Sequence, residues 1–247
     1  MESMSGLSDR KSAPVLKATL HRLREMALAA RPGDFLGSEE ELRDLLGVSR
    51  PTYRQAVRML EQDQLLTKRM GPHGGCYASR PDPNSLSRLA ALYLQVERAT
   101  LHNLMNVSHG LQQHALTAAC RCEDEGAREG LRRFLGDLAL ENRLDDAAWF
   151  LERERAFEQH ILTMAGNPAL RLFFQISRQF VDDSPASQLL IANIAMRRLR
   201  ALAWTRLGEA VLSGAIEEAI EISHQQHNAF VALVPGETLR SDAVRAA

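Results

Sequence analysis

The sequence has little cysteine, no C-x-x-C pair and no long apolar run. Three cysteines in 247 residues, an odd number, exclude a disulfide framework and a cysteine zinc site, and they fit a reducing cytosol. The longest uncharged run, residues 99–120, contains three histidines and is too polar to cross a bilayer. The N-terminal residues lack the apolar core of a signal peptide. We therefore expect a cytoplasmic protein that has no membrane partner.

An excess of charge of either sign is also missing, because 30 basic and 31 acidic side chains give a net charge of −1. Nucleic-acid binding must then be judged from how the charges are distributed. Residues 1–80 carry 13 Lys and Arg against 10 Asp and Glu, whereas residues 81–247 carry 17 against 21. Between the two parts, residues 79–85 contain two prolines, which predict a linker.

The part after the linker is predicted to be helical throughout. Apolar residues recur three and four positions apart, with charges between them, in segments 86–94, 111–119, 131–140, 147–164, 170–180, 189–212 and 215–233. No alternating strand or hairpin dipeptide interrupts these segments. The pattern predicts an all-α bundle of six or seven helices over residues 86–235, with a large buried interior, followed by a C-terminal tail at 236–247.

The part before the linker combines helices with a short hairpin. A helix is predicted over residues 15–30, and Ser38 with Glu41 forms a capping box that begins a short second helix, which Gly47 ends. Ser49 caps a third helix over residues 50–62, and β-like stretches at 65–69 and 76–79 flank a glycine-rich turn. This order predicts a winged helix-turn-helix over residues 14–78, preceded by a flexible arm at 1–13. The whole fold is expected to be mainly α.

The third predicted helix has a basic face. Arg50, Arg54 and Arg58 are four residues apart, which places them on one side of the helix. An arginine near the start of such a helix can donate to the O6 and N7 atoms of guanine in the major groove, although a solvated surface is the alternative explanation. The predicted DNA-binding set adds hydroxyls that contact phosphates and residues of the wing: Ser49, Arg50, Thr52, Arg54, Arg58, Lys68, His73, Gly74 and Gly75.

The segment GDFLGSEEELRDLLGVSRPTYRQAVRMLEQDQLLTKRMGPHGGCYAS resembles the DNA-binding domain of GntR-family transcriptional regulators. It carries the patterns L-x-S-E-x-E-L, L-G-V-S-R, R-x-A-x-x-x-L-E and a G-x-G-G wing in the family's order. The resemblance implies contacts to bases and phosphates from Ser49, Arg50, Thr52 and Arg54, and entry of Gly75 into the minor groove.

The chain departs from this pattern at Glu40, where the family usually has an arginine. A carboxylate cannot pair with a phosphate and would repel it. We therefore expect weaker or differently oriented backbone contact from the second helix, unless Arg43 replaces the missing cation.

The helical part resembles the C-terminal ligand-binding domain, called FCD, of the GntR subgroup typified by the fatty-acid regulator FadR. The resemblance rests on AFEQHILTMAGNPAL and AVLSGAIEEAIEISHQQH. Many such domains hold a divalent metal with one Asp and three His, but the four matching positions are Glu154, Glu158, Trp204 and Gln226. No metal cofactor is therefore expected, although His160, His224 and His227 leave a rebuilt metal site open.

A cavity without a metal remains the expectation for the bundle. Glu154 and Glu158, with Trp204 opposite, would form an acidic wall and an aromatic face, which suit an amine, a polyol or an apolar ligand with a hydroxyl. In the alternative, each glutamate faces water or pairs with Arg153, Arg155 or an arginine of the cluster Arg197, Arg198 and Arg200. The predicted effector-binding set is His109, Gln112, Glu154, Glu158, Trp204 and Gln226.

Together these features predict a homodimeric transcriptional regulator that binds an inverted-repeat operator in double-stranded DNA and responds to an unidentified small molecule. Two alternatives stay open: a DNA-binding dimer whose bundle serves only dimerisation, and an enzyme built in the bundle. The sequence contains no Ser-His-Asp order and no G-x-S-x-G, P-loop, G-x-G-x-x-G or H-E-x-x-H motif, so no catalytic residue is predicted.

Overall fold

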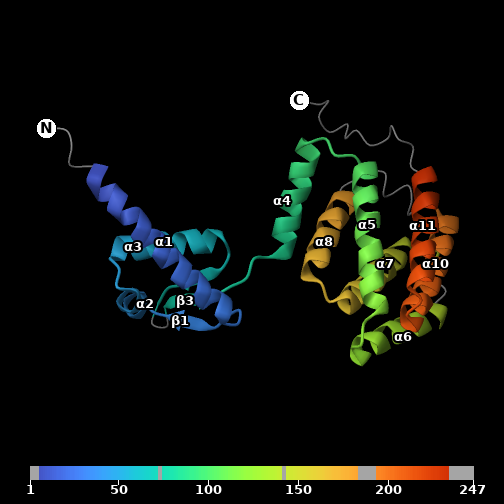
Figure 1. Ribbon diagram of the computed structural model, residues 1–247, viewed down its shortest axis with the longest axis horizontal. Helices are drawn as coiled ribbons and strands as arrows, with labels where there is room; N and C mark the ends of the chain where they lie inside the picture. Colours follow the sequence, from blue (N-terminus) through green and yellow to red (C-terminus); the bar gives the residue numbers. More distant parts are fainter. Residues whose placement is uncertain (1–5, 72–73, 141–142, 183–192, 234–247) are drawn as a thin grey trace. The chain divides into compact units, whose positions relative to one another are not determined.

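The computed structural model describes residues 6–71, 74–140, 143–182 and 193–233 (Figure 1). The chain divides into two compact units, residues 1–85 and residues 86–247. The division falls directly after the segment in which the sequence predicts a linker. Each unit has its own hydrophobic core.

The first unit is a winged helix-turn-helix. Its elements are α1 (Gly6–Ala29), β1 (Phe35–Gly37), α2 (Glu39–Leu46), α3 (Arg50–Gln62), β2 (Leu66–Arg69) and β3 (Gly75–Ala78). The Ser38 hydroxyl accepts the Glu41 amide, and the Glu41 carboxylate accepts the Ser38 amide, so the predicted capping box is confirmed. Gly47 ends α2 in the left-handed conformation, also as predicted.

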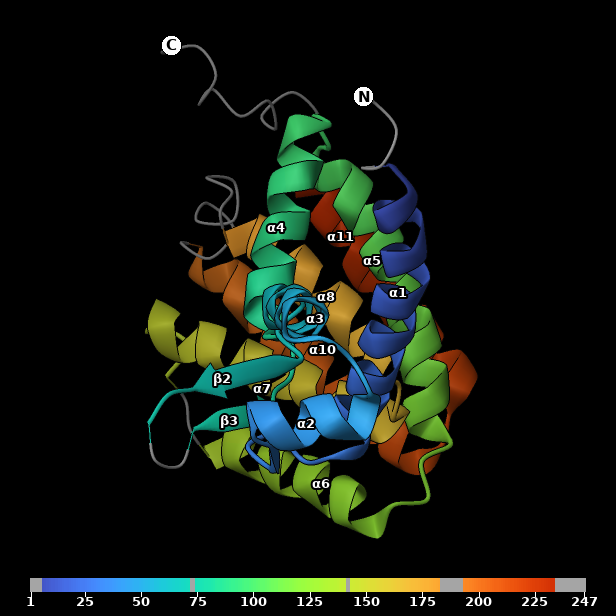
Figure 2. The ribbon, with the colours of Figure 1, turned by 90° about the vertical axis from the view of Figure 1, so that its left-hand side faces the viewer.

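The antiparallel sheet of this unit has β3 in its centre, between β1 and β2. Strands β2 and β3 form the hairpin of the wing, with Leu66 opposite Ala78 and Arg69 opposite Gly75 (Figure 2). Strand β1 is absent from the sequence prediction, because three residues are too few to show a strand pattern. It is held by pairing with β3 and by the packing of the Phe35 ring against Tyr77, with centroids 5.3 Å apart.

Helix α1 begins at Gly6, so the prediction of a flexible arm through residue 13 is wrong for residues 6–13. Residues 7–13 contain neither glycine nor proline, and nothing in them stops a helix. Pro14 lies inside the helix, where its fixed φ is compatible with helical geometry although it provides no N–H. Residues 1–5 and the predicted tail at 236–247 lie outside the described residues.

The predicted linker is taken up by folded elements rather than forming a free connection. The Arg80 guanidinium donates to three carbonyl oxygens between residues 27 and 30, at 2.6–3.1 Å, and so satisfies the end of α1. The side chain of Gln64 accepts the Asp82 amide at 2.7 Å. Pro83 then begins the next helix, in a position where the missing N–H is not needed.

The second unit contains α4 (Pro83–Val96), α5 (Leu101–Cys120), α6 (Glu125–Leu140), α7 (Ala147–Ala165), α8 (Pro168–Asp182), α10 (Ile194–Ser213) and α11 (Ile216–Leu233). These seven helices, counted over the described residues, confirm the predicted fold class. Helix α5 begins ten residues before its apolar pattern, because Thr100 and Asn103 form a capping box there. The predicted start at residue 189 lies outside the described residues, and α10 begins after its cap, Asn193.

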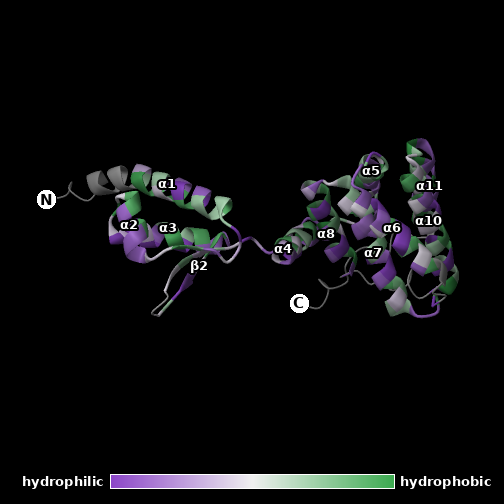
Figure 3. Cartoon of the chain, turned by 90° about the horizontal axis from the view of Figure 1, so that it is seen from below, coloured by the Kyte–Doolittle hydropathy of each residue, from purple (hydrophilic) through white to green (hydrophobic). Residues whose placement is uncertain are grey.

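The core of the bundle is formed by apolar faces of helices that are polar on their other sides (Figure 3). Helix α7 contributes Trp149, Phe150 and Phe157, all buried. The Trp204 ring of α10 stacks on Phe150 with centroids 4.9 Å apart. Within the described ranges, we find no helix with the length and apolarity that crossing a membrane requires.

Candidate nucleic-acid interface and ligand cavity

The N-terminal end of α3 presents the predicted DNA-contacting arginines to solvent. Ser49 caps the helix, since its Oγ accepts the Thr52 amide and lies 2.9 Å from the Thr52 hydroxyl. The side chains of Arg50 and Arg54 are 63% and 53% exposed, and Arg58 is exposed as well. None of the three is buried against the body of the protein, so this face is open to a major groove.

A single carboxylate, that of Glu39, contacts three cations of this face. Its Oε1 lies 3.3 Å from Arg50 Nε and 3.1 Å from Arg54 Nε, and its Oε2 lies 3.2 Å from Lys68 Nζ. Partial burial opposes ionisation of Glu39, but hydrogen bonds from Lys68 and Arg54 outweigh it and hold the pKa below the usual value. We define the Glu39 cluster as Glu39 with Arg50, Arg54 and Lys68.

The departure from the family pattern, Glu40, is exposed and makes no ion pair with any residue that the structure describes. Arg43, which the sequence offers as a replacement cation, is only half-buried. The start of α2 thus carries one neutralised carboxylate, Glu39, beside one that is free, Glu40. Weak phosphate contact from α2 stays a prediction.

One cation of the wing, Lys68, belongs to the Glu39 cluster. Lys68 on β2 contacts Glu39, and its backbone amide donates to the Glu61 carboxylate at 2.9 Å. This pairing fixes the position of β2 relative to α2 and α3. His73, the other polar residue predicted for the wing, lies outside the described residues.

The two wing glycines are needed by the hairpin itself. A Cβ atom on Gly75 would lie 2.6 Å from Phe35 Cε2 and 2.7 Å from the Gly37 carbonyl oxygen. A Cβ atom on Gly74 would lie 2.7 Å from the Gly71 carbonyl oxygen. Gly75 is therefore not at the hairpin tip where the sequence reasoning placed it, since it is buried, pairs with Arg69 and lies against β1. Its entry into the minor groove stays a prediction. Sequence reasoning missed this packing because it missed β1.

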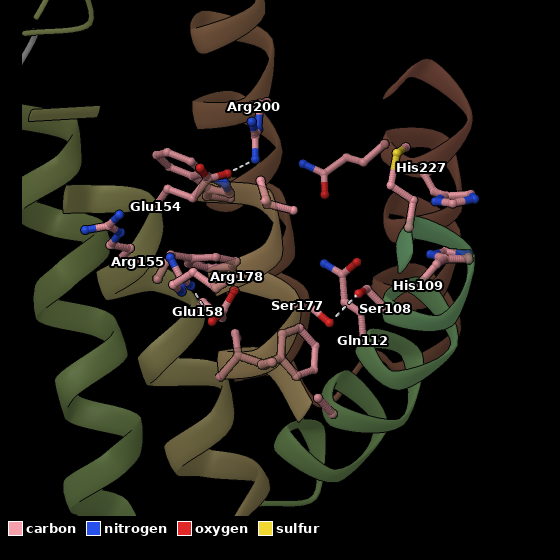
Figure 4. A pocket seen from close by; sticks show the side chains of 18 of the residues that line it. Ser108, His109, Gln112, Glu154, Arg155, Glu158, Ser177, Arg178, Arg200 and His227 are labelled. Carbon is pink, nitrogen blue, oxygen red and sulfur yellow. Dashed lines mark hydrogen bonds and ion pairs between the residues drawn. The ribbon is translucent and has the colours of Figure 1, made fainter. Parts of the chain in front are cut away.

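The second unit encloses a cavity of about 370 Å³ between α5, α7, α8, α10 and α11 (Figure 4). All six residues of the predicted effector-binding set line it: His109, Gln112, Glu154, Glu158, Trp204 and Gln226. Much of the wall is apolar and includes Leu104, Phe157 and Phe174. A cavity of this size, with an apolar wall and a few polar groups, can hold a small organic molecule.

The glutamates of the cavity wall are paired with arginines. Glu154 forms an ion pair with Arg200, and Glu158 forms one with Arg178 (Figure 4). At the same wall, Arg155 lies 3.0 Å from the Asp182 carboxylate. The expected acidic wall is therefore wrong. The alternative holds for Glu154, which pairs with one of the arginines considered, whereas Arg178, the partner of Glu158, was not among them.

Burial changes the acid–base properties of these pairs. It raises the pKa of Glu158 above its usual value, against the opposing influence of Arg178 and Arg155. It lowers the pKa of Arg200 to about 10, which still leaves the guanidinium charged at neutral pH. We define the paired wall as Glu154 with Arg200, Glu158 with Arg178, and Asp182 with Arg155.

The opposite side of the cavity carries a histidine cluster from α5 and α11 (Figure 4). His109 Nε2 lies 3.0 Å from His224 Nδ1, and the Gln113 amide nitrogen lies 3.0 Å from Nε2 of both rings. The His227 ring stacks on His109 with centroids 4.2 Å apart. Burial, with the charges that His227 and His224 would carry, lowers the pKa of His109 to about 4.

Which ring nitrogens of His109 and His224 donate depends on the tautomer of each ring, because the single lone pair of His109 Nε2 can accept from Gln113 or from His224 but not fully from both. Nδ1 of His109 is sheltered from solvent and has no partner among the described residues.

The cavity does not fit the metal that the family resemblance implies. The carboxylates of Glu154 and Glu158 are taken by arginines, and Trp204 has no lone pair in the ring plane to offer. His224 and His227 lie with His109, whereas the His160 ring packs against Phe134, 5.3 Å between centroids. Across the described residues, no group of three or more His, Cys, Asp or Glu side chains is arranged to hold a metal ion.

Sequence reasoning also missed several polar residues of the cavity. Arg178 and Asp182 belong to α8, which the sequence treats only as an apolar helix. The hydroxyls of Ser108 and Ser177 join α5 to α8 at 3.0 Å. The period of α8 would have placed Arg178 beside Phe174, four residues earlier, on the inward face.

Comparison with known proteins agrees with this architecture. The model of the bacterial regulatory proteins of the gntR family matches residues 17–73. The transcriptional regulator Mce2R of Mycobacterium tuberculosis is 28% identical over 195 residues, covering 74% of this chain and 75% of that protein. The uncharacterised regulator YcbG of Bacillus subtilis is 27% identical over 161 residues, covering 65% and 64%.

The fold is shared with a solved GntR structure from Streptococcus agalactiae. The TM-score is 0.64 at 19% identity, and the match covers 89% of this chain and 100% of that one. The winged helix-turn-helix and these relatives define a DNA-binding transcriptional regulator. Residues 17–73 are its GntR-family DNA-binding domain.

Proposed function

We propose that this GntR-family regulator acts as a homodimer on an inverted-repeat operator, and that a small molecule in the cavity of the second unit changes its DNA affinity. The observation that carries the proposal is the pairing of an exposed basic face on α3 with a ligand-sized cavity in the bundle. A ligand can shift DNA affinity only if it binds two arrangements of the dimer differently, typically by about 1–3 kcal/mol.

DNA contact is proposed for the exposed cations at the start of α3 and on the wing. Arg50 and Arg54 lie in the first turns of α3, where a recognition helix meets base edges. The Ser49 and Thr52 hydroxyls lie at the helix start, close to where a phosphate would be held. Arg58, one turn further along, is suited to a phosphate at the edge of the groove.

A second copy of the chain is proposed to cover the outer face of α4. Ala91 of this helix is buried against α5 and α8, whereas Leu89, Tyr93 and Val96 are 66%, 63% and 71% exposed. An apolar stripe of this kind on a soluble domain marks a protein–protein contact. Two-fold symmetry also suits an operator built from two half-sites.

The ligand proposed for the cavity is a small molecule with a mostly apolar body and a few polar groups. The paired wall leaves no net charge, so of the three ligand types that the sequence suggested, the amine loses its basis, whereas the polyol and the apolar ligand with a hydroxyl remain. The polar lining groups outside the ion pairs are Gln112, Gln226, His109, His227 and the hydrogen-bonded hydroxyls of Ser108 and Ser177. A bundle that only dimerises is the competing function.

The DNA part is tested by selecting bound duplexes from a random-sequence library. We expect the enriched duplexes to share an inverted repeat, and Arg50→Ala to weaken binding to them by about 1–3 kcal/mol in fluorescence anisotropy at fixed salt. Binding of a palindromic site by a dimer would appear as two chains per duplex in sedimentation. No enrichment, or unchanged affinity of Arg50→Ala, would contradict the assignment.

The ligand part is tested by fluorescence, because both tryptophans, Trp149 and Trp204, lie in the bundle and Trp204 lines the cavity. Monocarboxylates, dicarboxylates, polyols and aliphatic amines would be titrated individually. A true ligand raises the melting temperature with concentration and shifts the tryptophan emission. Filling the cavity with Ser177→Leu should abolish both effects. Operator affinity that no compound changes would favour the dimerisation-only alternative.

A further inference from the structure

We propose that Glu39 is a positioning residue for DNA recognition, which holds Arg50, Arg54 and Lys68 in a fixed arrangement and thereby raises sequence discrimination while it lowers non-specific affinity. The inference rests on the proposed DNA contacts of these cations. It concerns how the interface chooses among sequences, which the contacts alone do not explain.

The geometry of the Glu39 cluster joins all three parts of the DNA-binding face. Glu39 begins α2, Arg50 and Arg54 lie on α3, and Lys68 lies on β2 of the wing. The three contacts lie between 3.1 and 3.3 Å. One carboxylate therefore ties the recognition helix to the wing before any DNA is bound.

The ion pair of each arginine with Glu39 runs through Nε, and Arg54 Nε–H donates to Glu39 Oε1. A guanidinium has five N–H donors, and the Nε–H is the one directed sideways from the chain. The terminal Nη groups, which form the two parallel bonds to guanine O6 and N7, remain available while Nε stays on the carboxylate. Glu39 can thus orient Arg54 without competing for the donors that read a base.

Orientation of this kind favours specific over non-specific binding. An arginine with free torsions finds a phosphate at almost any sequence, because the phosphate attraction depends little on direction. An arginine that is held at Nε reaches base edges only in one register. The carboxylate also offsets one of the three positive charges at the proposed DNA contacts, which weakens sequence-independent attraction to phosphates.

The simpler explanation for Glu39 is that a carboxylate in the first turn of α2 favours the helix dipole. Glu40 and Glu41 occupy the same turn, and Glu41 already completes the capping box. Glu40 is therefore a matched control. Glu40→Gln removes the same charge from the same turn but breaks no ion pair within the described chain.

The test compares wild type, Glu39→Gln and Glu40→Gln on a library-selected duplex and on a scrambled duplex of equal length, over a series of salt concentrations. We expect Glu39→Gln to raise affinity for the scrambled duplex several-fold and to steepen its salt dependence by about one unit of slope. The ratio of selected to scrambled affinity should fall about tenfold, the range of one lost base readout. Glu40→Gln should strengthen both duplexes by one common factor and keep the ratio.

A double-mutant cycle with Arg54→Ala identifies the route of the effect. If Glu39 acts through Arg54, then Glu39→Gln should change the ratio much less in the Arg54→Ala background than in wild type. If Glu39 has only a structural role, Glu39→Gln should lower the ratio equally in both backgrounds and should also reduce the protection of the α3 amides from hydrogen exchange.

Three results would overturn the inference. The first is that Glu39→Gln leaves the ratio of selected to scrambled affinity unchanged. The second is that Glu40→Gln lowers this ratio as much as Glu39→Gln does. The third is that Glu39→Gln lowers it equally in wild type and in the Arg54→Ala background. In each case the wild type still binds the selected duplex, so the proposed function survives. Failure of the wild type to discriminate any duplex would overturn the DNA contacts themselves and the inference with them.

Discussion

The Glu39 cluster and the paired wall use the same chemistry in two different ways. Each contains three cations from several elements, but in the first Glu39 alone faces all three, whereas the cavity provides one carboxylate for each cation. The first arrangement keeps a positive excess near solvent. The second leaves no net charge on the cavity wall, where the Glu154 and Glu158 pairs are mostly buried and the Asp182 pair is about half exposed. A surface cluster with a net positive charge can attract a polyanion, whereas a set of ion pairs with no net charge leaves the cavity wall neutral.

The different surroundings also predict different energetics. Arg50 and Arg54 are more than half exposed, so water replaces much of what an ion pair with Glu39 contributes. Arg200 and Arg178 are only 28% and 22% exposed, and a lost partner there leaves a charge with little water around it. The same substitution, glutamate to glutamine, should therefore have unequal effects on folding in the two units.

The largest effect is expected for Glu154→Gln in the paired wall. The substitution leaves the Arg200 guanidinium without a carboxylate inside the bundle and should lower the free energy of unfolding by about 3 kcal/mol. Urea unfolding followed by tryptophan emission measures it, because both tryptophans lie in the bundle. Glu152→Gln, an exposed neighbour on α7 with no described ion pair, is the matched control and should have little effect.

The double variant Glu154→Leu with Arg200→Met distinguishes a lost contact from a stranded charge. If the loss in Glu154→Gln comes from the uncompensated cation, replacement of both partners by apolar residues should restore most of the stability. A double variant as unstable as Glu154→Gln would show instead that the pair itself stabilises the bundle, and the comparison between the two clusters would fail.

In the DNA-binding unit, the largest loss is expected from a packing change and not from a charge change. Gly75→Ala places a Cβ atom within 2.7 Å of Phe35 and of the Gly37 backbone, and it should destabilise the wing by about 2 kcal/mol. Hydrogen exchange of the β2 and β3 amides measures this effect. Gly71→Ala adds a methyl at a site with open space, although at a φ of +105°, and tests how much of the loss is backbone strain. Unaltered exchange in Gly75→Ala would mean that Gly75 is not packed tightly against β1.

The sequence allowed the elements of both units to be predicted better than the contacts between them. Helix caps such as Ser38 and Gly47 act over three or four residues, so their signals are local and visible in the chain. The pairing of Glu39 with Lys68 spans 29 residues and depends on how the wing folds against α2. No periodicity records such a contact.

The cavity shows the same limit. The family resemblance placed Glu154 and Glu158 on the inward side of α7, and both line the cavity. Their partners, Arg200 and Arg178, lie on α10 and α8, and which arginine faces which glutamate follows only from helix packing. For this reason the residues that face the interior were predictable, whereas the charge of the cavity was not.

A smaller effect in the bundle is expected from pH. Burial lowers the folded-state pKa of His109 from 6.5 to about 4, so the unfolded chain takes up a proton at this site before the folded chain does. Stability should be unaffected by this group above pH 6.5 and should fall as the pH is lowered from 6.5 toward 4. Solvent reaches the cluster and limits the size of the fall.

Tryptophan-monitored unfolding at pH 7.5 and pH 5 compares wild type with His109→Gln, which should lose less stability on acidification. His114→Gln, an exposed histidine on the same helix, is the control and should follow wild type. Glu158, whose pKa is raised, titrates alike in all three proteins and cancels in the comparison. If His109→Gln loses as much stability between pH 7.5 and pH 5 as wild type does, protonation of His109 does not contribute to the pH dependence of the bundle.

The smallest effect on folding is expected for Glu39→Gln, about 1 kcal/mol or less. The carboxylate loses three ion pairs and a favourable position at the start of α2, but the arginines remain solvated and their charges are screened. Hydrogen exchange of α3 in low and moderate salt measures the change. A loss as large as that of Glu154→Gln would mean that the Glu39 cluster stabilises the fold as the paired wall does, and its positive excess would then need another explanation than DNA recognition.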